Sequence, residues 1–275
     1  MKFWKYHGLG NDFVLLEDLE GEMPMDAAFV TEVCERRFGI GADGILYVCR
    51  SDRADYAMRI MNADGSEAEM CGNGIRCLAK HIHDRGMVEG DVMSIETLAG
   101  IMHVTVSVEG GTTMVEVDMG APELDCQSIP VDCEGRFLDS PLPAPLGDVM
   151  GSAISMGNPH FVTFDELEDE ELDTLGPYIE SHPLFPRKTN VEFASVRAGR
   201  IYVRVFERGA GWTLACGTGA CATTVAAALK GLVPYDSPVE VVLPGGVLRI
   251  TVDSDLSSVI MTGPAEIVFK GEMMR

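Results

Sequence analysis

Short runs of alternating apolar and polar residues occur along most of the chain and predict a protein rich in strands. From Val92 to Asp118 the alternation is interrupted by turns at 98–100 and 109–111, a pattern typical of antiparallel hairpins. Residues 239–268 repeat this pattern. Further strands are expected at Phe3–Tyr6, Phe13–Leu16, Ile45–Val48, Tyr56–Met61, Ala153–Ser155, His160–Phe164 and Ile201–Phe206.

Helical patterns are fewer, and the two clearest follow a Cys-Gly-x-Gly tetrapeptide. After the first tetrapeptide, four apolar residues share one helix face: Ile75, Leu78, Ala79 and Ile82. After the second, residues 220–229 are almost free of charge and rich in alanine, so this helix is expected to be buried on all sides. The acidic segment 165–173 predicts a third helix that is exposed to solvent. Residues 120–147 are rich in Pro and turn residues, and form either a linker or the entry to a second domain.

The two tetrapeptides belong to a longer internal repeat. Cys71-Gly72-Asn73-Gly74 and Cys216-Gly217-Thr218-Gly219 are 145 residues apart, and Met58–Asn62 matches Val203–Glu207 at the same spacing. Two further pairs keep the same order: Gly10–Val14 with Gly157–Val162, and Met119–Pro122 with Met261–Pro264. A repeat of this length predicts two homologous domains rather than a solenoid. We expect an α+β fold in which each domain wraps a mostly antiparallel sheet around one central helix.

Bulk properties exclude some classes of partner. The chain has 275 residues, 46% of them hydrophobic, and a formal charge of −22, which disfavours binding to nucleic acid. No segment approaches the roughly 20 apolar residues of a membrane span, and the N-terminal residues lack the apolar stretch of a signal peptide. We therefore expect a cytoplasmic protein. Its eight cysteines include no Cys-x-x-Cys pair, and we expect all to be reduced thiols, with Cys34, Cys49, Cys126 and Cys133 as inert packing.

The paired cysteines carry the chemistry that the sequence suggests. A cysteine at the start of a helix meets the partial positive charge of unpaired N–H groups, which lowers its pKa. The same N–H groups, left uncovered by glycine, can hold a carboxylate. If both helix starts face one substrate, one thiolate can remove an α-proton while the other thiol protonates the opposite face. This is racemisation or epimerisation by two bases without a cofactor, and the helix N–H groups would stabilise the enediolate.

Other functions remain open at this point. A zinc site could use Cys71, Cys77, His81 and His83, although Cys-x5-Cys is not a usual spacing and the second repeat has no matching histidines. A Cys/His hydrolase could use His160 as its base, but one nucleophile would leave the second tetrapeptide unexplained. A racemase for another amino acid and a non-catalytic ligand- or metal-binding protein are further alternatives. The chain has no phosphate-binding Gly-x-x-x-x-Gly-Lys-Ser/Thr loop and no His-Glu-x-x-His motif.

The sequence also resembles the diaminopimelate epimerase family over nearly its whole length. The resemblance is carried by these segments: His7–Phe13, Asn62–Ser66, Met70–Cys77, Gly157–His160, Thr189–Glu192, Glu207–Gly211, Ala215–Ala220 and Gly263–Ala265. It implies interconversion of LL- and meso-2,6-diaminopimelate, without pyridoxal phosphate or metal, in lysine biosynthesis. It also implies a homodimer, and a first domain of residues 1–118 plus 263–275 around a second of residues 119–262. Proline racemases are similar in mechanism but typically carry His where this chain has Asn73.

The resemblance implies a role for each candidate residue. Cys71 and Cys216 would be the two acid/bases, and His160 and Glu207 would tune their pKa values. Substrate contacts are implied at Asn11, Asn62, Gly72, Asn73, Asn158, Asn190, Glu207, Arg208, Gly217 and Thr218, with Arg208 suited to the distal carboxylate. One departure is Gly44, where some family members carry a Gln that reaches the substrate.

Overall fold

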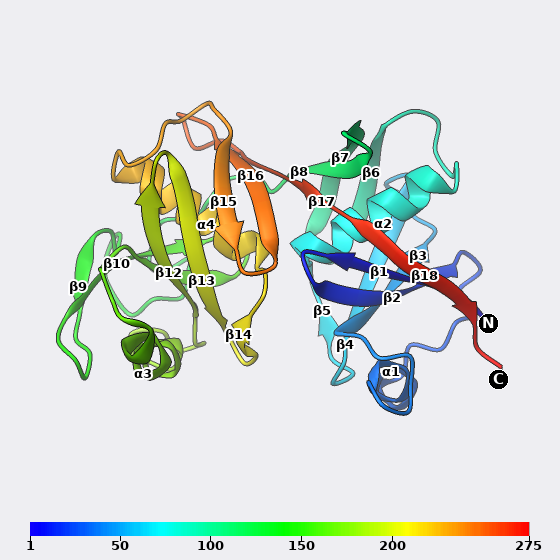
Figure 1. The fold of residues 1–275 in the computed structure, drawn as a ribbon, viewed down its shortest axis with the longest axis horizontal. Coiled ribbons are helices and arrows are strands. Elements are labelled where there is room, and N and C mark those ends of the chain that lie inside the picture. The colour runs from blue at the N-terminus through cyan, green and yellow to red at the C-terminus, as the bar shows by residue number, and fades with distance from the viewer. Residues whose placement is uncertain (275) are drawn as a thin grey trace. The chain divides into compact units, whose positions relative to one another are not determined.

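The structure is a computed structural model that describes residues 1–274, and these divide into two compact units (Figure 1). The first unit combines Met1–Asp118 with the C-terminal segment from Thr262, and the second holds Met119–Met261. The C-terminal strand lies antiparallel to the N-terminal strand, with Lys2 opposite Glu272 and His7 opposite Glu266. Both ends of the chain therefore belong to the first unit.

The first unit is a sheet with two helices. Its helices are α1 (Ala27–Cys34) and α2 (Gly72–Asp84). Its strands are β1 (Lys2–Gly8), β2 (Asn11–Asp18), β3 (Gly44–Cys49), β4 (Tyr56–Asn62), β5 (Glu67–Ala68), β6 (Val92–Thr97), β7 (Gly100–Glu109), β8 (Thr112–Asp118) and β18 (Glu266–Glu272). The expected hairpins are confirmed, because β6, β7 and β8 pair antiparallel in succession. Two neighbouring pairs, β2 with β3 and β4 with β6, are parallel.

The second unit repeats this arrangement. Its helices are α3 (Asp169–Glu180) and α4 (Gly217–Leu229). Its strands are β9 (Ser140–Leu142), β10 (Val149–Ser155), β11 (Pro159–Thr163), β12 (Asn190–Arg197), β13 (Arg200–Glu207), β14 (Gly211–Thr213), β15 (Val239–Leu243) and β16 (Gly246–Val252), and β17 (Val259–Pro264) leads back to the first unit. The parallel pairs recur as β11 with β12 and β13 with β15.

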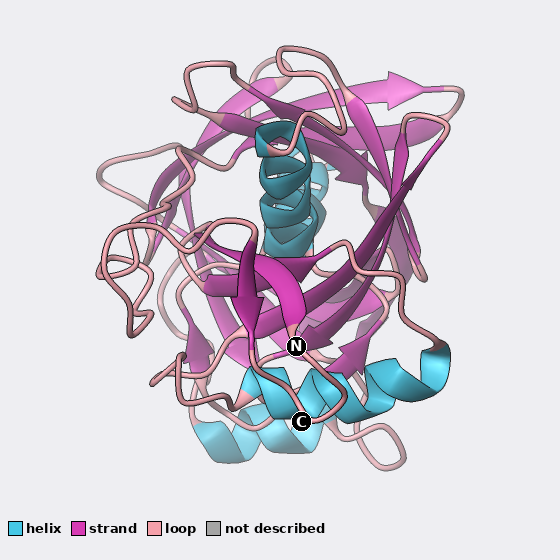
Figure 2. Ribbon diagram, turned by 90° about the vertical axis from the view of Figure 1, so that its left-hand side faces the viewer, coloured by secondary structure: helices cyan, strands magenta, loops and turns pink. Residues whose placement is uncertain are grey.

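Each unit has one helix at its centre. Helix α2 lies against strands of the first unit, among them β1, β7 and β8, and α4 lies against β10, β11, β12, β13, β15 and β16. In the view of Figure 2 a central helix is enclosed by strands. The four apolar residues predicted for one face of α2 are all buried, and α4 is buried on nearly every side, as its alanine-rich sequence predicts. The expected α+β fold is confirmed.

Two helices differ from what the sequence pattern indicated. Helix α3 begins at Asp169 rather than at residue 165. Its N-cap is Glu168, whose N–H donates to Glu171 Oε2 at 2.7 Å. It is not exposed on all sides, because Leu172, Leu175 and Ile179 are buried. Helix α1 was not predicted, since it is short and only its last turns bury residues. No helix within residues 1–274 is long and apolar enough to cross a membrane.

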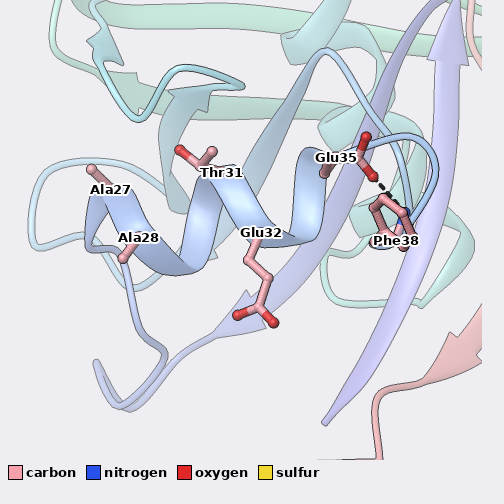
Figure 3. A pocket seen from close by; sticks show the side chains of 6 residues that line it. All are labelled: Ala27, Ala28, Thr31, Glu32, Glu35 and Phe38. Atoms are coloured by element: carbon pink, nitrogen blue, oxygen red, sulfur yellow. Dashed lines mark hydrogen bonds between the residues drawn. The ribbon is translucent and has the colours of Figure 1, made fainter.

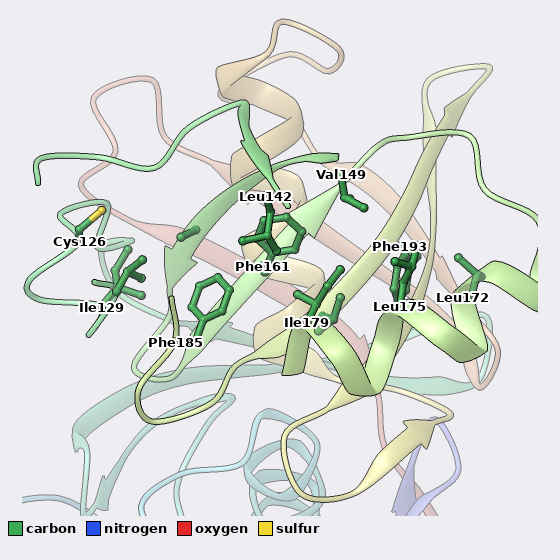
Figure 4. Packing of buried hydrophobic residues seen from close by; sticks show 13 residues of the cluster. Cys126, Ile129, Leu142, Val149, Phe161, Leu172, Leu175, Ile179, Phe185 and Phe193 are labelled. Atoms are coloured by element: carbon green, nitrogen blue, oxygen red, sulfur yellow. The ribbon is translucent and has the colours of Figure 1, made fainter. Parts of the chain in front are cut away.

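Residues 120–147 form part of the second unit rather than a linker. Cys126, Ile129, Val131 and Leu142 pack with Phe161 and other apolar residues of α3, β11 and β12 in one cluster (Figure 4). The expectation that all eight cysteines are free thiols is wrong for Cys126 and Cys133, which form a disulfide. A turn brings them together, since the Cys126 N–H donates to Gly135 O and Cys126 O accepts from Val131 N–H. The spacing Cys-x6-Cys carries no sequence signal for this turn.

Candidate functional site

Cys71 lies at the start of α2 because β5 and its turn end where the helix begins. It is the N-cap residue, with extended backbone, and its Sγ accepts from the Gly74 N–H at 3.4 Å. Arg76 braces this first turn from within, donating to Gly72 O and to Asn73 Oδ1, both at 3.0 Å. The backbone N–H groups of a first helical turn have no acceptor inside the helix. This end of α2 therefore has backbone donors that could receive an anion.

Three of the expected site residues of the first unit are in contact. The Cys71 thiol lies 3.8 Å from Asn11 Oδ1, and Asn73 Nδ2 donates to the same oxygen at 3.1 Å. Asn11 Nδ2 in turn donates to Asp43 Oδ2 at 2.9 Å. The Asn11 amide is thus held from both ends, with its oxygen toward Cys71. Asp43 was not predicted as a site residue, although it directly precedes Gly44, which the sequence analysis noted.

A cluster of charges holds Asp43 and the start of β2 in place. Arg36 Nη2 donates to Asp43 Oδ1 at 2.6 Å and to Asp12 Oδ1 at 2.8 Å, and Lys5 Nζ lies 2.6 Å from Asp12 Oδ2. Burial raises the pKa of Asp12, but hydrogen bonds from Arg36 and Lys5 outweigh this effect and lower its pKa to about 2. Asp12 is therefore ionised at neutral pH, and its ion pairs with Lys5 and Arg36 anchor the strand end that carries Asn11.

Cys216 occupies the same helix position in the second unit. It is the N-cap of α4, its Sγ accepts from the Gly219 N–H at 3.4 Å, and Thr218 Oγ1 lies 3.5 Å away. Burial raises the pKa of Cys216 well above its ordinary value, and the charges of Glu207 and Glu192 raise it further. This is opposite to the lowering that the helix N-terminus alone predicts, because desolvation and two nearby carboxylates outweigh the helix dipole.

His160 connects two residues beside α4. Its Nδ1 is 2.7 Å from Glu192 Oε1 and its Nε2 is 3.0 Å from Asn158 Oδ1. Both ring nitrogens are therefore occupied, so this arrangement does not favour a hydrolase in which His160 serves as base to a cysteine. Glu192 was not singled out in the sequence, although it ends the motif Thr189–Glu192. Its role is visible only once β11 and β12 pair.

The remaining candidates of the second unit lie around the turn after β13. Asn190 Nδ2 donates to Pro159 O at 2.8 Å, and Asn190 Oδ1 accepts from the Arg208 N–H at 3.0 Å. Arg208 Nη1 donates to Arg187 O at 3.3 Å. Glu207 Oε1 accepts from Thr213 Oγ1 at 2.5 Å. Asn190 therefore ties the segment before His160 to the turn that carries Arg208.

Asn62 and Gly44 lie opposite each other on β4 and β3. Asn62 Nδ2 donates to Ser66 Oγ at 3.0 Å, within the turn that follows β4. A β-carbon at Gly44 would lie 2.6 Å from Met61 O, so no larger side chain fits without a backbone shift. The close approach of β3 and β4 at this point therefore leaves no room at position 44 for the Gln of some family members.

The residues considered for zinc have other partners. His81 is fully buried, with Nε2 2.9 Å from Glu17 Oε1 and Nδ1 3.2 Å from the Tyr6 hydroxyl. Burial lowers the pKa of His81, against the opposing effect of Glu17. His83 Nε2 lies 3.1 Å from Asp91 Oδ1. Within residues 1–274, no group of three or more His, Cys, Asp or Glu side chains is arranged to hold a metal ion.

A surface hollow runs along α1. It is lined by Ala27, Ala28, Thr31, Glu32, Glu35 and Phe38 (Figure 3). Glu35 accepts from the Phe38 backbone N–H there, and the Phe38 side chain is 93% exposed. None of the expected site residues lines this hollow.

Comparison with known proteins gives a consistent result. The family profile described as diaminopimelate epimerase matches residues 3–124 and 152–268. The diaminopimelate epimerase of Desulfitobacterium hafniense is 48% identical over 285 aligned positions, which cover 100% of this chain and 98% of that protein. That of Carboxydothermus hydrogenoformans is 50% identical over 282 positions, 99% of each. The crystal structure of a hydroxyproline epimerase from Agrobacterium vitis has a TM-score of 0.70 at 16% identity, covering 99% of this chain and 90% of that one, which shows a shared fold.

Proposed function

Because this chain belongs to the diaminopimelate epimerase family, whose members are isomerases that work without pyridoxal phosphate, we propose that it interconverts LL- and meso-2,6-diaminopimelate with two cysteine thiols. The reaction would serve lysine biosynthesis. The observation that carries the mechanism is that Cys71 and Cys216 each cap the N-terminus of the central helix of their own unit. Two thiols in equivalent places suit a reaction that needs one base and one acid on opposite faces of a carbon.

In the proposed reaction the substrate α-carboxylate is held by N–H groups at the starts of α2 and α4. One cysteine, as thiolate, takes the α-proton, and the electron pair of the broken C–H bond moves into an enediolate. The same N–H groups stabilise this charge as an oxyanion hole does. The thiol of the other cysteine then gives its proton to the opposite face of the carbon. One proton is taken and one returned, so the stereocentre is inverted.

The surroundings of Cys216 suit it to the role of acid. Burial and the charges of Glu207 and Glu192 raise its pKa, so Cys216 is a thiol at neutral pH and has a proton to give. Cys71 would then be the base for the substrate isomer that reacts first. In the reverse reaction the two roles are exchanged, as microscopic reversibility requires.

The end of the substrate that does not react would bind to polar side chains from both units. Asn62, Asn158 and Asn190 supply amides for its ammonium and carboxylate groups, together with the Glu207 carboxylate. Arg208 donates to Arg187 O through Nη1, and its guanidinium has further N–H donors for the distal carboxylate. A polar site of this kind rejects the wrong stereoisomer strongly, since a mismatched isomer leaves buried groups unpaired.

The test is solvent deuterium incorporation at the α-carbon of LL-diaminopimelate, followed by NMR with reductant and no added cofactor. The wild type should form meso product that carries deuterium. Cys71→Ser and Cys216→Ser should each lose roughly 100- to 10,000-fold in kcat/KM. Full activity in either variant would end the two-base mechanism.

The chain supplies matched controls in the next buried cysteine of each helix. Cys77→Ser and Cys221→Ser make the same chemical change in α2 and α4, and both should keep activity close to wild type. A buried hydroxyl is tolerated in α4, where Thr223 and Thr224 already donate to carbonyls one turn back at 2.7 and 2.9 Å. Loss of activity in the controls as well would indicate a fault of folding.

The assembly and its location are part of the same proposal. The family relationship supports a homodimer in the cytoplasm with a small-molecule substrate. The charge of −22 disfavours a nucleic-acid partner. Sedimentation of the purified protein at micromolar concentration would distinguish a dimer from a monomer.

A further inference from the structure

Glu192 is a buried carboxylate with an unusual environment. It has no exposed surface, nor has His160, and the Glu192 Oε1 to His160 Nδ1 distance is 2.7 Å. Its second oxygen, Oε2, is buried without a hydrogen-bond partner within residues 1–274. A buried polar group without a partner costs free energy, so a chain keeps one only where something else is gained.

The fold itself does not need an ionisable pair at this place. In the first unit, Leu46 on β3 lies opposite Ile60, and in the second Glu192 on β12 lies opposite Val205, which matches Ile60 in the repeat. Leu46 is the nearest neighbour of a β-carbon placed on Gly74, as Glu192 is for Gly219. Leu46 is therefore the counterpart of Glu192.

The counterpart of His160 is apolar as well. In the first unit Leu46 pairs with Leu15, and Phe13 lies two residues before Leu15 on the same strand. In the second unit Glu192 pairs with Val162, and His160 lies two residues before Val162. Phe13 is therefore the counterpart of His160. Phe13 and Leu46 are both buried. The same position is thus filled by two hydrocarbon side chains behind Cys71 and by a His–Glu pair behind Cys216. Since apolar replacement of a buried ion pair is often neutral or stabilising, the pair is not required for stability.

The Glu192 carboxylate lies beside the start of α4. A β-carbon placed on Gly219 would lie 2.7 Å from Glu192 Oε1 and 3.3 Å from Cys216 Sγ. Glu192 Oε1 and Cys216 Sγ therefore both lie next to the position of this β-carbon, and any side chain at position 219 would collide with the carboxylate. Glycine at this position leaves the room that Glu192 needs next to the Cys216 thiol.

The proton positions follow from the contacts of His160. The Asn158 side-chain oxygen Oδ1 can only accept, so His160 Nε2, 3.0 Å away, carries a hydrogen and donates to it. The other ring nitrogen, Nδ1, shares one hydrogen with Glu192 Oε1 at 2.7 Å, and burial raises the pKa of Glu192. The Asn158 amide is then turned so that its Nδ2 points away from His160, and no hydrogen bond within residues 1–274 uses that Nδ2.

We propose that Glu192 is a positioning residue of the epimerase site: it fixes the His160 hydrogen on Nε2, and His160 thereby turns the Asn158 NH2 group toward the substrate. This rests on the proposed function for the role of Asn158. Glu192 touches neither substrate nor the reacting carbon, and it exerts this positioning role through His160.

The experiment compares Glu192→Gln with Glu192→Leu. A Gln side chain can donate to His160 Nδ1 and keeps the hydrogen on Nε2, so it should retain kcat/KM within about 10-fold of wild type. A Leu side chain leaves Nδ1 without a partner, so kcat/KM should fall by roughly 100-fold, as expected for a misplaced binding group. If Gln loses as much activity as Leu, the carboxylate charge and not the histidine hydrogen is what matters, and the proposal is wrong.

A second readout does not depend on activity. In protein labelled with 15N-histidine, the His160 signals are identified by their loss in His160→Gln. Nε2 should give the shift of a protonated nitrogen in the wild type and in Glu192→Gln, and a mixture of tautomers in Glu192→Leu. An unchanged spectrum in Glu192→Leu would overturn the proposal. This result stands even if the protein proves inactive on diaminopimelate, which separates it from a failure of the proposed function.

The matched control is a second His–Glu pair, in the first unit, whose histidine is buried and whose glutamate is half-buried. His81 lies on α2, well beyond the turn that follows Cys71, and its Nε2 is 2.9 Å from Glu17 Oε1. Glu17→Leu should disturb the His81 tautomer and leave kcat/KM at the wild-type value. An equal loss of activity in this control would show that any broken buried pair slows the enzyme, and would remove the case for Glu192.

Discussion

Cys71 and Cys216 cap equivalent helices, yet the two units surround them with different chemistry. Behind Cys71 the strands present Phe13 and Leu46, and behind Cys216 they present His160 and Glu192. The two asparagines of the repeat differ in the same way. Asn11 is held by a carboxylate that Arg36 anchors, and Asn158 is held by a histidine.

The difference shows that a repeated fold can carry unlike acid/base groups. Both units supply a helix start that can bind an anion, so this part of the scaffold recurs in each unit. The substrate is not symmetric about its reacting carbon, because one side bears the distal amino-acid group. Unlike polar groups beside the two thiols are therefore what an enzyme needs to tell two faces of one carbon apart.

The largest loss of activity is expected when His160 and Glu192 are replaced by the residue types of their first-unit counterparts, Phe13 and Leu46. The double substitution His160→Phe with Glu192→Leu should leave the unfolding temperature near or above that of wild type, since a buried pair is replaced by hydrocarbon. Activity should fall by roughly 1,000-fold or more, because Asn158 loses the donor that orients its amide. Calorimetry tests the expected unfolding temperature, and kcat/KM measured on the same preparation tests the expected loss of activity.

The comparison has its own control in the first unit. His81→Phe with Glu17→Leu makes the same two changes at the pair remote from Cys71. This variant is expected to lose stability through the Tyr6 hydroxyl, which would no longer have His81 as a partner, while activity per folded molecule is kept. If the second-unit double variant keeps wild-type activity, the polar pair behind Cys216 has no part in the reaction.

A smaller effect is expected when the support of Asn11 is removed. Asp43→Ala deletes the acceptor for Asn11 Nδ2, so the amide can turn its oxygen away from Cys71. We expect kcat/KM to fall by roughly 10- to 100-fold with little change in unfolding temperature. Asp55→Ala is the matched control, because Asp55 also accepts hydrogen bonds, from Ser94 at 2.8 Å, but at the start of β6. Equal losses in both variants would contradict a role for Asp43 in the site.

The sequence predicted what depends on local pattern and repetition. Alternation located β6, β7 and β8, and the uncharged run after Cys216 predicted a central buried helix. The positions of Cys71 and Cys216 as helix caps followed from the tetrapeptides.

What escaped the sequence depends on contacts between distant strands. Glu192 meets His160 only because β11 pairs parallel with β12, and the repeat hides the pair, since its counterparts are Phe13 and Leu46. The raised pKa of Cys216 was missed for the same reason, because burial and two carboxylates from other strands decide it. The helix dipole argument considers α4 alone and predicts a lowered pKa for Cys216. Burial and the carboxylates on neighbouring strands raise this pKa instead.

The smallest expected effect concerns another feature that the first unit lacks, the Cys126–Cys133 disulfide. It closes a loop of only seven residues' separation, so its loss should cost the second unit about 2 kcal/mol, seen as a fall of a few degrees in unfolding temperature. Cys126→Ala with Cys133→Ala should leave kcat/KM unchanged, since neither residue is a candidate site residue. Thiol titration in denaturant decides whether the bond is present in the purified protein: six free thiols indicate the disulfide, and eight indicate that both cysteines are reduced. If eight thiols are found, and the protein unfolds at the same temperature as the double variant, the disulfide adds nothing to stability. The difference between the units is then confined to the residues behind Cys71 and Cys216, which cap the two central helices.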